Sequence, residues 1–206
     1  PPAACHVEPE VTKLVLRKNC IRIPEKLCEK HPELREIDFN NCSVAVGERA
    51  FHRCYKLERV YNTSNILWIH SHAFRNCPML RGSINLIRAG HIEKAAFSNC
   101  INLKHVILRG RGTINESAFS NCTRLQSIVF AGNFPSVTLK TNTFDSIPDS
   151  HKLAMPQVEL FEDYFYDYPY WNTGEKEVFV IPLTGDEYPD SAQNIHLNFP
   201  PLTHTD

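Results

Sequence analysis

A repeat of 22 to 23 residues constrains the fold of this chain more than any other feature of its sequence. Residues 96–130 contain the phrase Ala-Phe-Ser-Asn-Cys twice, each time followed after two residues by Leu and then by branched apolar residues. Phe97 recurs as Phe119, and Leu103 recurs as Leu125. A period of this length is typical of a solenoid, in which each unit stacks on the next and shares its core. Because solenoids mostly offer binding surfaces, the repeat indicates a general role but no particular partner.

Two patterns recur with this period. The first has apolar residues at its first, fourth and sixth positions and is rich in branched residues, which predicts a strand. It occurs at residues 11–16, 34–39, 57–62, 103–108 and 125–130, with a degraded copy at 80–84. The second pattern leads from Ile or Val to Ala-Phe and then to Cys, which predicts one or two helical turns with one buried face. Its first residues are Ile23, Val46, Ile69, Ile92, Ile114 and Val137.

Stacking follows because neither element of a unit can bury its apolar side alone. Identical connections place successive strands in parallel, about 4.8 Å apart. Because the helical side is wider than the strand side, the stack of units should curve. We therefore expect an α/β horseshoe with a parallel sheet on the concave side and short helical turns on the convex side. Gly82 and Ser83 interrupt one strand phrase, and Phe144 follows Val137 at the wrong spacing, so the sheet should be irregular there.

The phrase Ala-Phe-x-x-Cys-x-x-Leu-x-x-Ile resembles the BspA-like, or treponemal-type, leucine-rich repeats, over residues 11–155. The resemblance implies a non-catalytic leucine-rich-repeat domain over residues 1–155, with about six repeats, that recognises protein partners. Such repeats occur in bacterial surface adhesins and in large protist families. Related proteins often seal the last unit with a short helix, so we expect residues 156–206 to form a C-terminal cap and tail.

Charge divides the chain at the same place. Residues 1–155 carry 21 Lys and Arg against 13 Asp and Glu, whereas residues 156–206 carry one Lys against 10 Asp and Glu. An acidic, aromatic tail could fold against the basic body or meet a separate partner. A tail that grips a neighbouring protein would make the chain a structural subunit of a larger assembly, which is our alternative to a self-contained binding module.

The eight cysteines fall into two groups. Four hold one repeat position and should be reduced, buried core residues: Cys54, Cys77, Cys100 and Cys122. In the first unit His31 takes this position, and Cys28 falls at the Phe position. The N-terminal cysteines would allow a Cys5–Cys20 or Cys28–Cys42 bridge in an oxidising compartment. Reduced thiols slightly favour a cytoplasmic location, and a secreted or cell-surface chain with its signal peptide removed stays open.

The sequence offers little support for catalysis, metal binding or nucleic-acid binding. It contains no phosphate-binding loop and no nucleophile with an evident base, so we expect no enzyme and no cofactor. His70 and His72 would need further ligands to hold zinc, and the repeat supplies none. Residues 109–112, Arg-Gly-Arg-Gly, predict a turn that needs glycine, and no continuous basic stripe points to a nucleic acid. No apolar run is long enough to predict a membrane span.

A binding site is predicted at strand positions that the core does not need. The fifth position of each strand phrase lies between two inward positions and should face outward, yet it is largely apolar. Its residues are Asp38, Tyr61, Ile84, Ile107 and Val129, and beside them at the third position are Glu36, Arg59 and His105. We predict that these residues contact a protein partner and that charge reversal at Ile107 abolishes the contact. Cover by the aromatic tail is the alternative explanation of the apolar strip.

Overall fold

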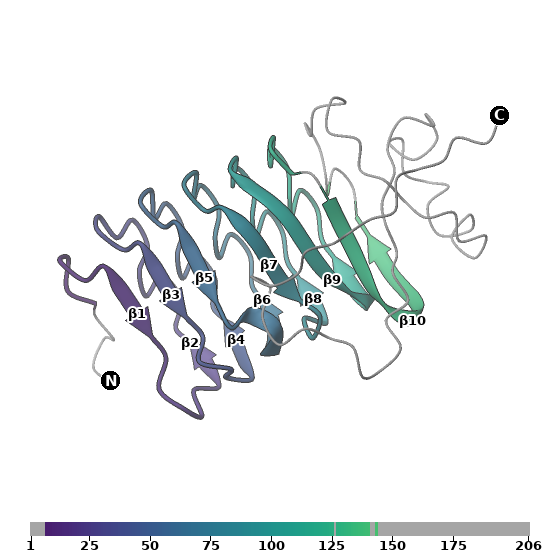
Figure 1. The fold of residues 1–206 in the computed structure, drawn as a ribbon, viewed down its shortest axis with the longest axis horizontal. Helices are drawn as coiled ribbons and strands as arrows, with labels where there is room; N and C mark the ends of the chain where they lie inside the picture. Colours follow the sequence, from purple (N-terminus) through teal and green to yellow (C-terminus); the bar gives the residue numbers. More distant parts are fainter. Residues whose placement is uncertain (1–6, 126, 141–142, 144–206) are drawn as a thin grey trace.

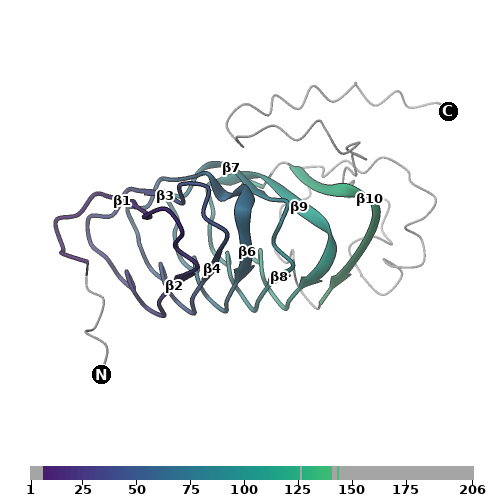
Figure 2. The ribbon, with the colours of Figure 1, turned by 90° about the horizontal axis from the view of Figure 1, so that it is seen from below.

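The chain winds into a two-sided solenoid, seen in a computed structural model that describes residues 7–125, 127–140 and 143. Each unit crosses one side of the body in a strand, turns, and crosses the other side in a second strand (Figures 1 and 2). The strands on the first side are β1 (Lys13–Val15), β3 (Glu36–Asp38), β5 (Arg59–Tyr61) and β7 (Gly82–Leu86). Those on the second side are β2 (Arg22–Ile23), β4 (Val44–Val46), β6 (Ile66–Ile69) and β8 (His91–Ile92).

Two longer strands, β9 (Leu103–Ile114) and β10 (Ser127–Leu139), cross from the first side to the second. Residues 105–108 of β9 pair with β7, and residues 113–114 pair with β8. All strand pairs are parallel, and the two sheets run in the orders β1-β3-β5 and β10-β9-β8-β6-β4-β2, with β7 joined to β9. The parallel repeat sheet predicted from the sequence is therefore confirmed, whereas the horseshoe curvature stays a prediction.

The predicted helical turns are strands and tight turns instead. Ile23, Val46, Ile69, Ile92 and Ile114 each end a strand segment, and the Ala-Phe segments that follow are turns. Within the described residues, the helical element is a single 3-10 helix, η1 (Thr63–Asn65). The prediction treated the spacing from Ile to Ala-Phe as one helical face, but the same spacing also fits a strand followed by a turn.

Lateral hydrogen bonds explain why these segments are not helical. The N–H groups of Lys26, Cys28 and Lys30 donate to carbonyl groups of the next unit, at 2.9, 2.7 and 2.7 Å. An α-helix would direct each N–H group to the carbonyl group four residues earlier in the same unit. The positive φ angles of Arg49 (53°) and Arg53 (61°) also lie outside the right-handed helical region. The turns therefore form ladders along the solenoid.

Stacks of equivalent side chains fill the space between the two sides. The rings of Phe51, Phe74, Phe97 and Phe119 follow one another with centroids 5.1, 5.1 and 5.2 Å apart. All four rings are almost fully buried. Burying a side chain of this size contributes about 1.5–3 kcal/mol relative to leaving it exposed. The distance between neighbouring units is thus also a distance at which aromatic rings stack.

The repeat cysteines form a second stack and are free thiols, as predicted. Each thiol donates to a carbonyl group of the preceding unit, for example Cys54 to Cys28 at 3.0 Å and Cys77 to Phe51 at 3.2 Å. Burial raises the pKa of Cys54 to about 12. Cys28 and Cys42 are not joined in a disulfide, so the bridge considered between them is not formed. Cys5 lies outside the described residues.

His31 replaces the cysteine in the first unit, as the sequence predicts. It is buried, and its Nδ1 accepts a hydrogen bond from the N–H of Leu34 at 3.1 Å. Nδ1 is then the unprotonated nitrogen, so Nε2 donates to the carbonyl oxygen of Glu8 at 2.8 Å. This contact ties the N-terminal segment to the first turn.

The irregularity predicted near Gly82 is a register slip. Ile84 pairs with Val106, and the register shifts between Gly82 and Ser83. Ile84 therefore takes the fourth, inward position of its strand rather than the fifth, and it is 1% exposed. The first sheet ends at β5, because β7 pairs with β9 and not with β5. In β10 the residue opposite Ile114 is Leu139, so the prediction that placed Val137 there is wrong.

The Arg-Gly-Arg-Gly segment lies inside β9, so the turn predicted there is also wrong. Its last residue, Gly112, has a φ of 122°. A Cβ atom at this position would overlap the carbonyl oxygen of Gly90 in the neighbouring unit. Glycine is therefore required, but for close approach of two backbones rather than for a turn.

The predicted tail falls outside the described residues, as do the cap and the boundary at residue 155. Within the described part of the chain, no helix is both long and apolar enough to cross a membrane.

Candidate protein-binding faces

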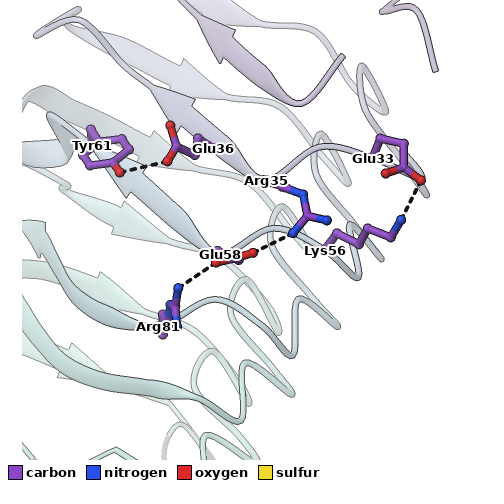
Figure 3. Close-up of polar contacts among 7 residues, drawn as sticks. All are labelled: Glu33, Arg35, Glu36, Lys56, Glu58, Tyr61 and Arg81. Carbon is purple, nitrogen blue, oxygen red and sulfur yellow. Dashed lines mark hydrogen bonds and ion pairs between the residues drawn. The ribbon is translucent and has the colours of Figure 1, made fainter. Parts of the chain in front are cut away.

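Rows of alternating charge mark the first side of the solenoid. The Glu58 carboxylate lies between two guanidinium groups, accepting from Arg35 at 2.8 Å and from Arg81 at 2.7 Å (Figure 3). A second pair joins Lys56 to Glu33 at 2.6 Å, and this contact lowers the pKa of Glu33. These residues come from equivalent positions of successive units, so the repeat itself aligns the charges. Each exposed pair contributes little to stability, which leaves the row available to a partner.

Tyr61 stands beside these rows on β5. Its hydroxyl donates to Glu36 at 3.2 Å (Figure 3). The Glu36 carboxylate also pairs with Lys13 at 3.2 Å. The Lys13 ammonium lies 5.6 Å from the centre of the Tyr61 ring, within cation–π range. Lys13, Glu36 and Tyr61 come from the three strands of the first sheet, and we call them the Tyr61 cluster.

Asp38 and Arg59 differ in the contacts that they make within the protein. The Asp38 carboxylate accepts hydrogen bonds from the Asn40 N–H and the Asn62 side chain, both at 2.8 Å, so it stabilises the turns after β3 and β5. Arg59 is exposed and pairs in register with Glu36. Of the predicted contact residues, the structure therefore brings together Glu36, Asp38, Arg59 and Tyr61.

The apolar members of the predicted strip are not exposed together. Ile84 belongs to the core, and Ile107 is 4% exposed. Val129 pairs with Ile107 through the backbone, but the structure does not describe the Val129 side chain. His105 is half-buried, and burial lowers its pKa. The expected apolar strip is therefore wrong for Ile84 and Ile107, because the register slip and burial remove them from the surface.

A second face carries an aromatic cluster that sequence reasoning missed. The Trp68 ring on β6 stacks on His91 of β8, with centroids 4.1 Å apart, and lies 5.5 Å from His70. Trp68 remains 37% exposed although it is the largest side chain in its row. The signal was available: Trp68 occupies the repeat position held by Ala45 and His91, one residue before each buried Val46, Ile69 and Ile92.

Glu93 fixes this cluster. Its carboxylate accepts hydrogen bonds from the Trp68 indole at 2.8 Å, from the Ser71 backbone and hydroxyl at 3.0 Å each, and from His70 at 3.1 Å. Partial burial alone would raise the pKa of Glu93, but these donors outweigh it and lower the pKa. The indole plane is thus held by an ionised carboxylate.

The two histidines considered for zinc have different neighbours. His70 contacts Trp68 and Glu93, whereas the His72 ring meets the edge of His52 at 6.5 Å between centroids. Burial lowers the pKa of both His52 and His72. In the described part of the chain, no group of three or more His, Cys, Asp or Glu side chains is placed to hold a metal ion.

These features define the class of protein: a parallel, two-sided repeat solenoid whose outward rows are assembled from equivalent positions of its units. The chain belongs to the BspA-type leucine-rich-repeat family, whose model matches in six copies over residues 3–110 and 88–170. The family resemblance of the Ala-Phe-x-x-Cys phrase is thereby confirmed. Comparison with curated proteins gives no match, and neither does comparison with solved structures. Repeats of this family typically serve as protein-interaction modules.

Proposed function

We propose that this chain is a non-catalytic module that binds a protein partner through the first side of the solenoid. The Tyr61 cluster is the observation that carries the proposal. Tyr61 is held by a hydrogen bond and an ammonium contact before any partner arrives, so little side-chain entropy is lost on binding. Tyrosine is also among the residues that most often dominate binding energy in interfaces.

The charged rows set the character of the partner surface. Arg35, Glu58 and Arg81 alternate in sign along the solenoid axis, so a matching surface carries the opposite alternation. Complementary charges of this kind accelerate encounter and select against other partners more than they raise affinity. Tyr61 then anchors the partner, and the charged rows set the position of the partner along the solenoid axis.

The residues first predicted for this site are used selectively in the proposal. Glu36, Asp38, Arg59 and Tyr61 form the contact surface in our proposal. His105 lies further along the same side of the solenoid, on β9, and Val129 pairs with Ile107 in register. Ile107 is no longer a selective test position, because a charge at a site that is 4% exposed would destabilise the fold itself.

Substitution of Tyr61 tests the proposal. After a partner is isolated by affinity purification from the native source, we expect Tyr61→Ala to weaken its binding at least about tenfold in isothermal titration calorimetry. Tyr61→Phe removes only the hydroxyl contact to Glu36 and should have a smaller effect. Tyr55→Ala is the matched control, since Tyr55 is an exposed tyrosine on a turn. Equal affinities for Tyr61→Ala and Tyr55→Ala would contradict the assignment.

The alternative role, a structural subunit whose acidic tail grips a neighbour, concerns residues outside the description. It stays a prediction, and rapid cleavage of residues 156–206 by protease in the free chain would favour it.

A further inference from the structure

Two imidazole rings meet in the turns of the second and third units. His52 is 8% exposed, and its ring meets the edge of the His72 ring at 6.5 Å between centroids. We call these two residues the imidazole pair. The repeat does not require a histidine at either position, because the equivalent residues of the fourth unit are Ser98 and Ala95, which are small and neutral. The pair is therefore an addition to the turn ladder.

His52 joins the turns of neighbouring units. Its Nδ1 lies 3.0 Å from the Arg75 carbonyl oxygen, and because a carbonyl group can only accept, Nδ1 carries the proton. The same oxygen accepts from the Arg53 N–H at 2.9 Å, and the His52 carbonyl oxygen accepts from the Lys30 N–H at 2.7 Å. Three successive units thus meet at His52, and a further proton on this ring must bind at Nε2.

His72 has a buried ring nitrogen without a partner. Its Nδ1 is buried, as is the Nε of Arg75, and neither atom makes a hydrogen bond among the described residues. Both backbone groups of His72 are bonded, the N–H to Lys94 at 3.0 Å and the carbonyl oxygen to the Arg75 N–H at 3.1 Å. A neutral imidazole tolerates this site at lower cost than an imidazolium, which carries a charge and a second N–H donor.

The charges around the pair oppose its protonation. The charged side chains that interact with the two rings are the cations Arg49, Arg53, Arg75 and Lys94 and the acids Glu29 and Glu48. Glu48 is exposed and lies 3.7 Å from the Arg49 guanidinium, which partly neutralises it. Burial lowers the pKa of both rings, and the nearby arginines lower it further. The folded protein therefore holds neutral rings at a pH where the unfolded chain holds charged ones.

We propose that the imidazole pair is an acid-sensitive contact, and that its protonation opens the turns between the second and third units. Because each pKa is lowered in the folded protein, the contact has its full stability above the ordinary histidine value of 6.5 and loses it as the pH falls below that value. The hydrogen bond from Tyr61 to Glu36 crosses the same two units, but the proposal does not rest on the function proposed above.

Amide hydrogen exchange of the full chain tests the proposal. The Arg53 N–H reports on the contact, because it shares the Arg75 carbonyl oxygen with His52. The Asn99 N–H is an internal control, since it has the equivalent position in the fourth unit and bonds Ser120 at 2.9 Å. After correction for the intrinsic exchange rate, we expect protection of Arg53 to fall at least about tenfold between about pH 7.5 and about pH 5, while that of Asn99 stays constant.

His52→Ser and His72→Ala together give the pair the residues of the fourth unit. In this doubly substituted chain, Arg53 should keep constant protection over the same pH range. His91→Ala is the matched control, because His91 stacks on Trp68 instead, and this variant should show the parental fall. Equal losses of protection at Arg53 and Asn99 would overturn the proposal, as would a fall that persists in the doubly substituted chain.

Proton NMR titration of the parent chain gives a check that needs no variant to fold. We expect the imidazole signals of His52 and His72 to titrate below pH 6.5, together with the loss of Arg53 protection. A pKa at or above 6.5 for both rings would also overturn the proposal.

Discussion

At the scale of single residues, the turns select for side chains that accept a left-handed backbone. One turn position recurs through the units with φ between 59° and 63°, and it holds Lys30, Arg53, Asn76, Asn99 and Asn121. Asparagine adopts this conformation more readily than other residues that carry a Cβ atom. The Asn-Cys pair of the repeat therefore combines a turn residue with a core residue, and the first two units depart from the preferred choice.

Arg53→Asn should stabilise the protein. The substitution places the residue of three later units at an exposed position with φ of 61°, and we expect a gain of about 0.5–1 kcal/mol in the free energy of unfolding. Urea denaturation followed by circular dichroism measures it. Arg53→Gln removes the same charge without favouring the left-handed backbone and should change stability little. A gain as large for glutamine would assign the effect to charge instead.

At the scale of elements, β9 depends on a glycine that lets two backbones approach. A Cβ atom at Gly112 would overlap the Gly90 carbonyl oxygen, which also accepts a hydrogen bond from Thr113 at 3.0 Å. The backbones of two neighbouring units therefore meet closely where β9 passes from the first side to the second.

Gly112→Ala should cost more than about 3 kcal/mol in the free energy of unfolding, because strain and overlap add. Gly82→Ala is the matched comparison. Gly82 also has a positive φ, 85°, but open space surrounds its missing Cβ, so only the backbone strain of about 1–2 kcal/mol applies. Thermal or urea unfolding of the two variants gives their losses of unfolding free energy, and the difference between these losses is the cost of the overlap. Equal losses would show that Gly90 moves aside.

Glu93 makes the contact between the ends of β6 and β8 dependent on pH. Its pKa is lowered in the folded protein, so its stabilisation is present above the ordinary glutamate value of 4.5 and is lost as the pH falls through the folded pKa. Glu93→Gln should therefore be less stable than the parent at pH 7, and the difference should shrink below pH 4.5. Urea unfolding at several pH values measures this. A difference that stays constant with pH would rule out ionisation as its cause.

The sequence predicts the elements that the repeat requires and misses those that depend on backbone hydrogen bonding and strand register. Leu, Phe and Cys ladders follow from periodicity alone, because any stacked unit must bury its recurring apolar residues. The second strands were mistaken for helical turns, since the periodicity does not reveal that N–H groups bond to the next unit. Ile84 was misplaced because a one-residue slip exchanges the two faces of a strand. Trp68 was missed because the second side was expected to hold helical turns, whereas Trp68 lies on a strand there.

At the scale of the whole molecule, the two sides offer different surfaces. The first side presents aligned charges around the Tyr61 cluster, and the second presents the Trp68 ring, which stacks on His91 and bonds Glu93.

The lateral hydrogen bonds of the turns and sheets all run along the solenoid axis. A force applied to the two ends therefore loads the interfaces between units in series, so the weakest interface yields first. We expect the chain to lengthen in steps under tension, each releasing one unit of 22 to 23 residues, or roughly 75 Å of extended chain. Optical tweezers would measure these steps, and a single large extension would contradict them. Held at both ends under tension, such a molecule would act as a spring with discrete extensions.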